Sequence, residues 1–208
     1  MIMRLTLMLG LLVSVSVVPA IAEAAPRRYY QYREPYYPRH DGLFLRLDGG
    51  LGGVRADDAL NDVTLSGGSV FFSLDVGGAV APNLALHGRL AINSMFEPAI
   101  SSGGEGLGAL DNTSLSFTLL GVGLTYYLPS NFYFTGVLGL SRASFEFYGD
   151  EYDVLNGIGF QGDFGYEWPL GGDWGIGIGA RLELNAVRGD SEKLSTAGLG
   201  ILASLTYF

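Results

Sequence analysis

The 208-residue sequence contains no cysteine. This absence excludes disulfide scaffolds, thiolate metal sites, cysteine nucleophiles and a lipoprotein anchor. Charged residues are also scarce, at 16%, and acidic residues outnumber basic ones to give a net charge of -9. A nucleic-acid-binding surface needs clustered Lys and Arg, so no nucleic-acid partner is expected.

Glycine is abundant, with 32 residues in the chain, about twice the usual frequency of ~7%. No Gly-X-Y period is present and there are only 8 prolines, which excludes collagen and disfavours a disordered linker. The mean hydropathy of +0.28 leans toward a membrane protein. The glycines are therefore expected to serve a folded, largely apolar structure of one domain or two small ones.

Residues 1–25 have the pattern of a secretory signal peptide. Arg4 precedes an apolar run from Leu5 to Val18, and small residues around Ala20 and Ala22 provide a cleavage site. The run of about 14 residues is too short for a membrane-spanning helix, which needs ~20. Export with cleavage near residues 22–25 is predicted.

Residues 26–41 (PRRYYQYREPYYPRHD) interleave tyrosine with arginine and proline. No periodicity is present, which favours an extended tether between the signal peptide and the rest of the chain. A second interpretation stays open, in which the arginines and tyrosines contact a polyanion or a sugar polymer through charge and stacking.

From Gly42 onward the apolar residues alternate with polar or small ones, as expected of β-strands that bury one face. Eight strands are predicted, and their starts are at about residues 43, 68, 84, 113, 132, 157, 174 and 195. Long and short intervals alternate, which indicates an antiparallel meander with tight turns near Pro82, Pro129 and Pro169 at one end. The other connections are predicted to be long acidic loops. Near Gly121 the alternation changes phase, so a bulge or a wrong strand boundary is expected there.

Three features favour a membrane barrel over a soluble one. The polar strand faces carry sparse charges among small residues, which suits the narrow interior of an eight-stranded barrel. Export and strands of about ten to thirteen residues suit a bilayer crossing. Aromatic residues gather at predicted strand ends beside the tight turns, where they would form an interfacial girdle. They are Tyr126, Tyr127, Phe132, Tyr133, Trp168, Trp174, Tyr207 and Phe208.

Four segments carry a family resemblance: GLFLRLDGGLGG at 42–53, the hairpin at 121–140, the hairpin at 159–184, and the terminal LTYF. On these segments the chain resembles the small eight-stranded outer-membrane β-barrel family of Gram-negative bacteria, which includes the barrel of the outer-membrane protein A type. The resemblance implies that Tyr207 and Phe208 form a C-terminal signal for the barrel assembly machinery. Thr206 departs from the aromatic or large apolar residue usual at that position, which leaves the phase of the last strand open.

Ten polar residues fall on the predicted inner face. They are Arg46, Asp48, Asp75, His87, Arg89, Gln161, Asp163, Glu167, Arg181 and Glu183. Buried charges must be paired, so a structural ion-pair and hydrogen-bond network in the lumen is predicted. The alternative is a conduit or a proton-active site.

The sequence gives little support for a catalytic site, a cofactor site or a metal site. A lipid hydrolase would need an activating histidine at the bilayer surface, but His40 falls in the tether and His87 on the inner face. Asp150, Glu151 and Asp153 could hold a hard cation, although an acidic loop facing lipopolysaccharide is the favoured interpretation. The glycine pairs 49–50, 52–53 and 103–104 precede no predicted helix, which argues against a phosphate site.

The sequence thus predicts an all-β, eight-stranded antiparallel transmembrane β-barrel over residues 42–208, monomeric, in the outer membrane, with both termini periplasmic. A structural or surface-interaction role is expected, with no enzyme activity, cofactor or metal. The partners would be lipid, lipopolysaccharide and the assembly machinery. A narrow channel and a secreted soluble barrel of lipocalin type are the alternatives. Residues 41–208 hold 7 basic and 19 acidic residues, so the barrel would carry a charge of -12.

Overall fold

The computed structural model describes residues 42–58, 63–103, 105–110, 113–147, 150–189 and 193–208. The predicted signal peptide and tether, including His40, lie outside these residues. The described residues form ten strands: β1 (Leu43–Asp58), β2 (Val63–Ala81), β3 (Leu84–Phe96), β4 (Ala99–Ser102), β5 (Glu105–Ala109), β6 (Thr113–Tyr127), β7 (Phe132–Phe147), β8 (Asp150–Gly171), β9 (Trp174–Arg188) and β10 (Lys193–Tyr207). No helix in the described ranges is long and apolar enough to cross a membrane.

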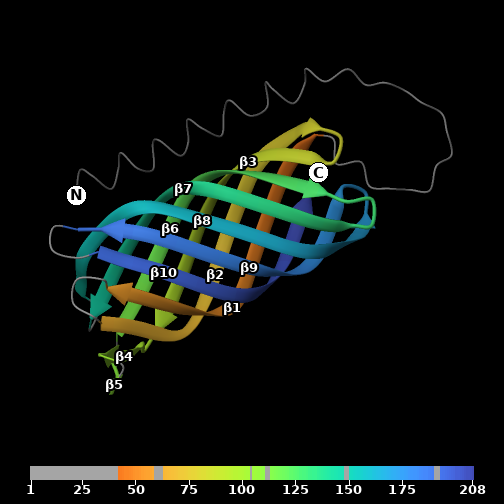
Figure 1. Ribbon diagram of the computed structural model, residues 1–208. Helices are drawn as coiled ribbons and strands as arrows, with labels where there is room; N and C mark the ends of the chain where they lie inside the picture. Colours follow the sequence, from red (N-terminus) through yellow and green to blue (C-terminus); the bar gives the residue numbers. More distant parts are fainter. Residues whose placement is uncertain (1–41, 59–62, 104, 111–112, 148–149, 190–192) are drawn as a thin grey trace, which may run out of the picture.

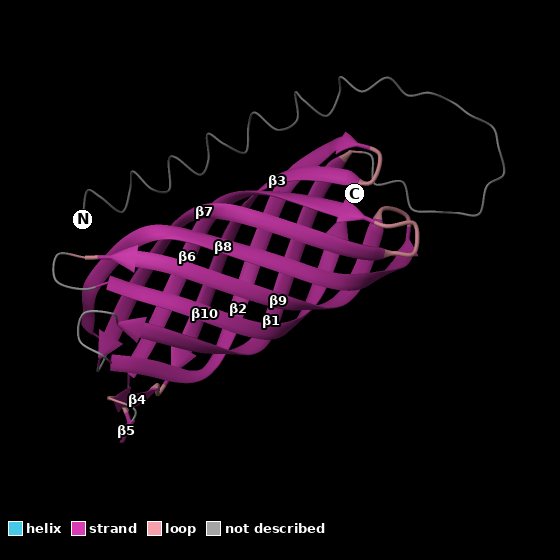
Figure 2. Ribbon diagram, in the orientation of Figure 1, coloured by secondary structure: helices cyan, strands magenta, loops and turns pink. Residues whose placement is uncertain are grey.

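Eight long antiparallel strands close into a barrel, as predicted from the sequence (Figures 1 and 2). Their order is β1-β10-β9-β8-β7-β6-β3-β2, and β1 also pairs with β2 to complete the ring. The short strands β4 and β5 form a hairpin that extends from the edge of β2, where Leu65 pairs with Ile100. The fold is therefore an all-β, up-and-down barrel with one additional hairpin.

The two ends of the barrel differ in their connections. Tight turns join β2 to β3, β6 to β7 and β8 to β9, and we call this end the turn side. Asn83, Asn131 and Gly172 in these turns have φ angles near +60°, a conformation that asparagine and glycine tolerate best. At the opposite end, the loop side, the strand ends Asp58 and Val63, Phe147 and Asp150, and Arg188 and Lys193 meet. Both ends of the described chain lie at the turn side, where the Phe208 amide donates to the Asp173 carbonyl at 2.9 Å.

The predicted alternation is present in all eight long strands. In β10, for example, Leu202, Ser204 and Thr206 are buried inside, while Ile201 and Leu205 are exposed. This fixes the phase of the last strand that the sequence left open. Leucine, valine, isoleucine and aromatic side chains cover the outside around the middle of the barrel, which is the arrangement of a membrane barrel and the inverse of a soluble one.

Two predicted strand starts were too late. β2 and β8 begin at Val63 and Asp150, not near 68 and 157, whereas β10 begins at Lys193, within two residues of its predicted start. The long strands accordingly run from 13 to 22 residues, and much of the predicted acidic loop sequence belongs to them. The error has a physical cause: at the loop side the outward positions are polar, so the expected pattern of apolar residues outside fades although the strand continues.

The predicted bulge near Gly121 is wrong. β6 pairs in unbroken register with β3, where Arg89 faces Gly121, and with β7, where Gly121 faces Gly139. Leu115 and Phe117 are nevertheless buried inside the barrel, while Val122 and Leu124 are exposed outside. The apolar residues change face because the environment changes along the strand, and the backbone stays regular.

The predicted aromatic girdle is correct only in part. Tyr126, Phe132, Trp168 and Trp174 are exposed on the outside, but Tyr127 and Tyr133 are buried inside. Adjacent residues of a strand point to opposite faces, so each aromatic pair contributes one ring to the girdle and one to the interior.

Candidate functional site: the barrel interior

All ten polar residues predicted for the inner face are buried within the barrel. They come from β1, β2, β3, β8 and β9. The structure arranges most of them in a central group, a group around Arg46 and a group around Glu183. Gln161 links the central and Glu183 groups, because it accepts from Arg89 Nη1 at 3.3 Å and donates to Glu183. The inward positions of β6, β7 and β10 supply hydroxyl side chains, among them Thr125, Thr135 and Thr206. These hydroxyls were not predicted, although their parity in the strands could have identified them.

The central ion-pair network contains two arginines and three aspartates. Arg89 Nε and Nη1 lie 2.6 Å from Asp75 and 2.7 Å from Asp163. Arg181 Nε binds the other oxygen of Asp163 at 2.7 Å, and its Nη2 lies 2.8 Å from Asp48. Because Asp163 receives both arginines, the network ties β1, β2, β3, β8 and β9 together across the lumen.

A second group surrounds Arg46 nearer the turn side. Arg46 Nη2 lies 2.6 Å from Glu167 and donates to the Tyr127 hydroxyl at 2.7 Å. The Thr206 hydroxyl donates to the same Glu167 oxygen at 2.8 Å. The guanidinium carbon also lies 4.0 Å from the centre of the Tyr133 ring, a cation–π distance.

Glu183 is bound differently, by amides instead of arginines. Its carboxylate accepts hydrogen bonds from Gln161 at 3.0 Å, Asn185 at 2.9 Å and Asn93 at 3.2 Å. Asn93 and Asn185 were not predicted as members of the lumen network, although both occupy inward positions. No arginine in the described chain forms a direct ion pair with Glu183.

His87 lies inside the barrel between polar and aromatic neighbours. Its Nε2 is 3.0 Å from the Thr125 hydroxyl, and its Nδ1 is 3.7 Å from Asp75. The ring centre lies 5.2 Å from that of Phe44. His87 therefore faces the lumen, as predicted, and not the lipid.

The buried groups do not balance in charge. Among the described residues, Arg46, Arg89 and Arg181 face five buried carboxylates, those of Asp48, Asp75, Asp163, Glu167 and Glu183. The buried carboxylates thus outnumber the buried arginines by two. Glu183 is the carboxylate that lacks a direct cationic partner.

Apolar side chains close the loop side of the interior. Each of the eight long strands contributes to this cluster, which we call the loop-side plug. Its members are Val54, Ala56, Leu65, Met95, Leu115, Phe117, Ala143, Leu155, Val187 and Leu194. The plug was not predicted, because the sequence pattern assigned those positions to loops or to the outer face.

A smaller aromatic cluster, the turn-side floor, closes the other end. Phe44, Ala85, Tyr127 and Tyr133 are buried there, with Phe208 packed against them. The Tyr127 and Phe208 rings meet edge to face at 5.3 Å. The ion-pair network is thus enclosed between two apolar layers.

Inward glycines make room for these large side chains. A Cβ built on Gly165 would lie 2.5 Å from the Tyr133 ring, and one on Gly200 would lie 2.5 Å from Phe71. Both distances are shorter than van der Waals contact, so only glycine fits there without movement. This packing agrees with the small residues that lie among the charges on the polar strand faces.

The interior offers no obvious metal centre. Within the described ranges no three His, Asp or Glu side chains are grouped to hold a metal ion. The side chains of Asp150, Glu151 and Asp153, which were considered for a hard cation, are outside the part that the structure describes.

No protein-family model matches the chain, and no curated protein matches its sequence. Solved structures do match. Neisserial surface protein A (NspA) superimposes with a TM-score of 0.55 at 15% identity, over 80% of this chain and 99% of the other. OprG from Pseudomonas aeruginosa matches with a TM-score of 0.46 at 15% identity, over 81% and 96%. Ail from Yersinia pestis matches with a TM-score of 0.44 at 13% identity, over 77% and 97%.

At such low identity the similarity to NspA concerns the fold alone. It agrees with the closed ring of eight antiparallel strands and with the apolar outer surface. The chain therefore has the fold of the small eight-stranded outer-membrane β-barrels.

Proposed function

We propose that the protein is a monomeric structural or surface-interaction protein of the outer membrane that neither conducts ions nor catalyses a reaction. The filled interior carries this proposal. Arg89, Arg181 and Asp163 occupy the middle of the lumen, and the loop-side plug and turn-side floor cover them. A barrel of eight strands has an interior just wide enough for such side chains to fill.

Orientation and partners belong to the same proposal. Both ends of the described chain lie at the turn side, which in barrels of this class is periplasmic. The loop side then faces lipopolysaccharide, and the strand ending in Tyr207 and Phe208 presents the signal for the assembly machinery. On intact cells, an external protease should cut near Asp150 and spare Pro169; the reverse pattern would invert the orientation.

Planar-bilayer recording tests the closed lumen. Purified protein should give no reproducible single-channel conductance. A reproducible conductance that changes on Arg89→Ala or Glu167→Ala would establish the narrow channel instead. The two variants come from different polar groups of the lumen, so the response of each would also locate the path.

Two further measurements test whether the protein is a soluble barrel or a lipid hydrolase. A lipocalin-type barrel would be monodisperse without detergent and would show no heat-modifiable shift on gels, whereas this protein should need detergent and show the shift. A lipid hydrolase would release fatty acid from vesicles in a manner abolished by His87→Ala. Since His87 lies inside the lumen against Thr125, we expect no release from the wild type or from the variant.

A further inference from the structure

Every basic side chain that the described barrel exposes on its outer surface lies at the loop side. These residues are Arg55 in β1, Arg142 in β7, Arg188 in β9 and Lys193 in β10. At the turn side the outer surface carries exposed aromatic side chains instead, for example Trp168. The two borders of the apolar belt therefore differ, because one is basic and the other is aromatic.

Three of the basic residues lie in one row across neighbouring strands. Arg188 is the register partner of Lys193, and Asn156 pairs with both Arg188 and Arg142. All four side chains are exposed, and β7, β8, β9 and β10 lie side by side in the barrel wall (Figure 1). Neighbouring strands are about 4.8 Å apart, so the row spans about 14 Å. Long basic side chains can close this distance around a single ligand.

The row is unfavourable without a ligand. Like charges directly opposite each other destabilise strand pairing, and Arg188 and Lys193 form such a pair. Among the described residues, no acidic residue is a register partner of a basic residue in the row. Glu146 in β7 is exposed too, but it lies four positions further toward the loops. Arg55 differs from the row, because its guanidinium binds Asp57 at 3.0 Å. A bound anion would offset the repulsion, so the row indicates an anionic ligand.

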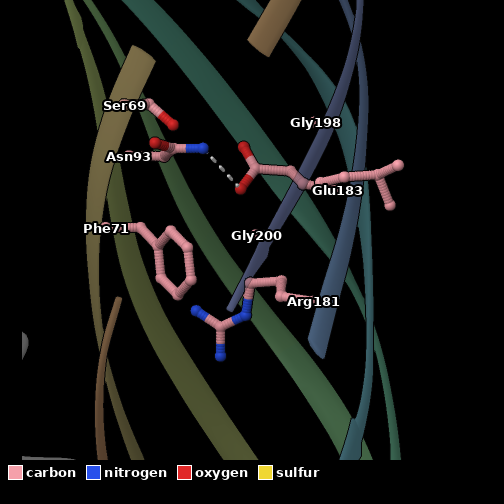
Figure 3. Close-up of a pocket in the computed structure, with 8 residues that line it drawn as sticks. Ser69, Phe71, Asn93, Arg181, Glu183, Gly198 and Gly200 are labelled. Atoms are coloured by element: carbon pink, nitrogen blue, oxygen red, sulfur yellow. Dashed lines mark hydrogen bonds between the residues drawn. The ribbon is translucent and has the colours of Figure 1, made fainter. Parts of the chain in front are cut away.

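Apolar side chains begin directly below the row, toward the middle of the barrel. Leu140 and Ile158 each lie two positions closer to the turn side than the row, and they are 70% and 60% exposed. A ligand that contacts both surfaces must join an anionic head to apolar chains, which is the structure of an anionic lipid. Such a molecule binds outside the barrel, because the cavity beside Arg181 and Glu183 in the lumen has a volume of only about 10 Å³ (Figure 3), the space of about one water molecule.

We propose that Arg142, Arg188 and Lys193 bind the phosphate groups of one lipopolysaccharide molecule, whose acyl chains pack on Leu140 and Ile158. This site rests on the proposed function, which turns the loop side toward lipopolysaccharide. Arginine binds phosphate through two parallel hydrogen bonds, and lysine binds it as a point charge. The bound head group would neutralise the row and hold this face of the barrel at the outer leaflet.

Native mass spectrometry of the mature protein in detergent tests the site directly. One molecule of a short-chain lipopolysaccharide should stay bound to the wild type. Arg188→Gln should weaken this binding by roughly fivefold, since one basic residue beside an anionic lipid contributes about this factor, and Lys193→Gln should weaken it similarly. Arg55→Gln is the matched control, because it removes the same charge from the same surface but outside the row. It should leave the binding unchanged, and a loss equal to that of Arg188→Gln would overturn the row as the site.

Two other lipids identify the ligand in the same measurement. Lipopolysaccharide without its phosphates should bind more weakly by roughly tenfold or more, because several basic contacts are lost together. Equal binding of this form would overturn the phosphate contact, and equal binding of phosphatidylglycerol would overturn the assignment to lipopolysaccharide. Binding in detergent does not depend on orientation, so its failure would leave the proposed function standing. The protease test on intact cells decides the orientation separately.

The sign of a stability change gives an independent test. In phosphatidylcholine vesicles Arg188→Gln removes a repulsion and should raise the folding equilibrium constant by roughly twofold. In vesicles that also contain lipopolysaccharide, the same variant loses a phosphate contact and should have a lower constant than the wild type. An effect of the same sign in both kinds of vesicle would contradict the proposal.

Discussion

The middle of the barrel and its loop-side end have opposite polarity on the same strands. Along β6, Val122 and Leu124 face outward while Gly123 and Thr125 face the polar lumen. Nearer the loops, Leu115 and Phe117 face inward while the serines beside them face outward. The middle is organised for lipid outside and charge inside, and the loop-side end for water outside and an apolar core.

This difference explains why the long strands extend beyond the apolar belt. A membrane-spanning strand needs about 9 to 11 residues, whereas β2 has 19 and β8 has 22. The additional residues build the loop-side plug, which buries its own hydrophobic core as a soluble barrel does. The residue pattern of one strand thus changes along its length: apolar side chains face outward where the strand lies in lipid and inward where it lies in water.

The largest expected effect is in the central network. Arg89→Met leaves Asp75 and Asp163 without one of their cations, and removal of one partner from a buried ion pair costs about 3–5 kcal/mol. Urea unfolding in lipid vesicles measures this loss. Arg55→Met is the matched control, because Arg55 pairs with Asp57 on the exposed surface and its loss should leave the unfolding midpoint unchanged. A similar shift for the two variants would refute the buried network as a source of stability.

The second effect concerns the loop-side plug. Leu115→Ala removes a fully buried side chain and should lower the free energy of unfolding by about 2–5 kcal/mol, as in a soluble core. Leu120→Ala on the same strand faces outward, where lipid can fill the space, so it should cost less in the same urea assay. If the order of the two costs is reversed, the plug is not packed as described.

The third effect compares two outward positions on β6. Val122 is 64% exposed in the apolar belt, and Val122→Arg should destabilise the barrel by about 2–4 kcal/mol, as expected near the bilayer midplane. Ser114→Arg lies at the loop-side end and should cost only ~0–1 kcal/mol. Equal costs in vesicle unfolding would mean that the belt extends to the end of the strand.

The inner face could be predicted from the sequence wherever the strand has the same environment along its whole length. Arg46 and Asp48 in β1, and Arg181 and Glu183 in β9, lie on the inner face because simple alternation places them there. It failed where the environment changes: the phase change near Gly121 suggested a bulge, but it marks the boundary between belt and plug. Alternation shows that two sets of residues lie on opposite faces of a strand, but it does not show which of the two faces is exposed to water.

The contacts within the lumen were beyond sequence reasoning for a related reason. Arg181 and Asp163 are neighbours in the register of β8 and β9, so their pairing follows once the hairpin is known. Arg46 and Glu167, in contrast, meet across the barrel at 2.6 Å. That contact depends on closure and strand stagger, which no local pattern encodes.

The smallest expected effect is a pH dependence at the loop-side end. The hydrogen bond from Arg55 lowers the pKa of Asp57, with a second contribution from Thr64. A carboxylate whose pKa is lower in the folded state adds stability above its unfolded pKa of about 3.9, and that stability is lost as the pH falls through the folded value. Because both side chains are exposed, the effect should be visible in the titration of Asp57 by carboxyl NMR but not in the unfolding midpoint. Arg55→Met should move the Asp57 titration up toward its ordinary value, and an unchanged titration would show that the surface pair does not form in solution.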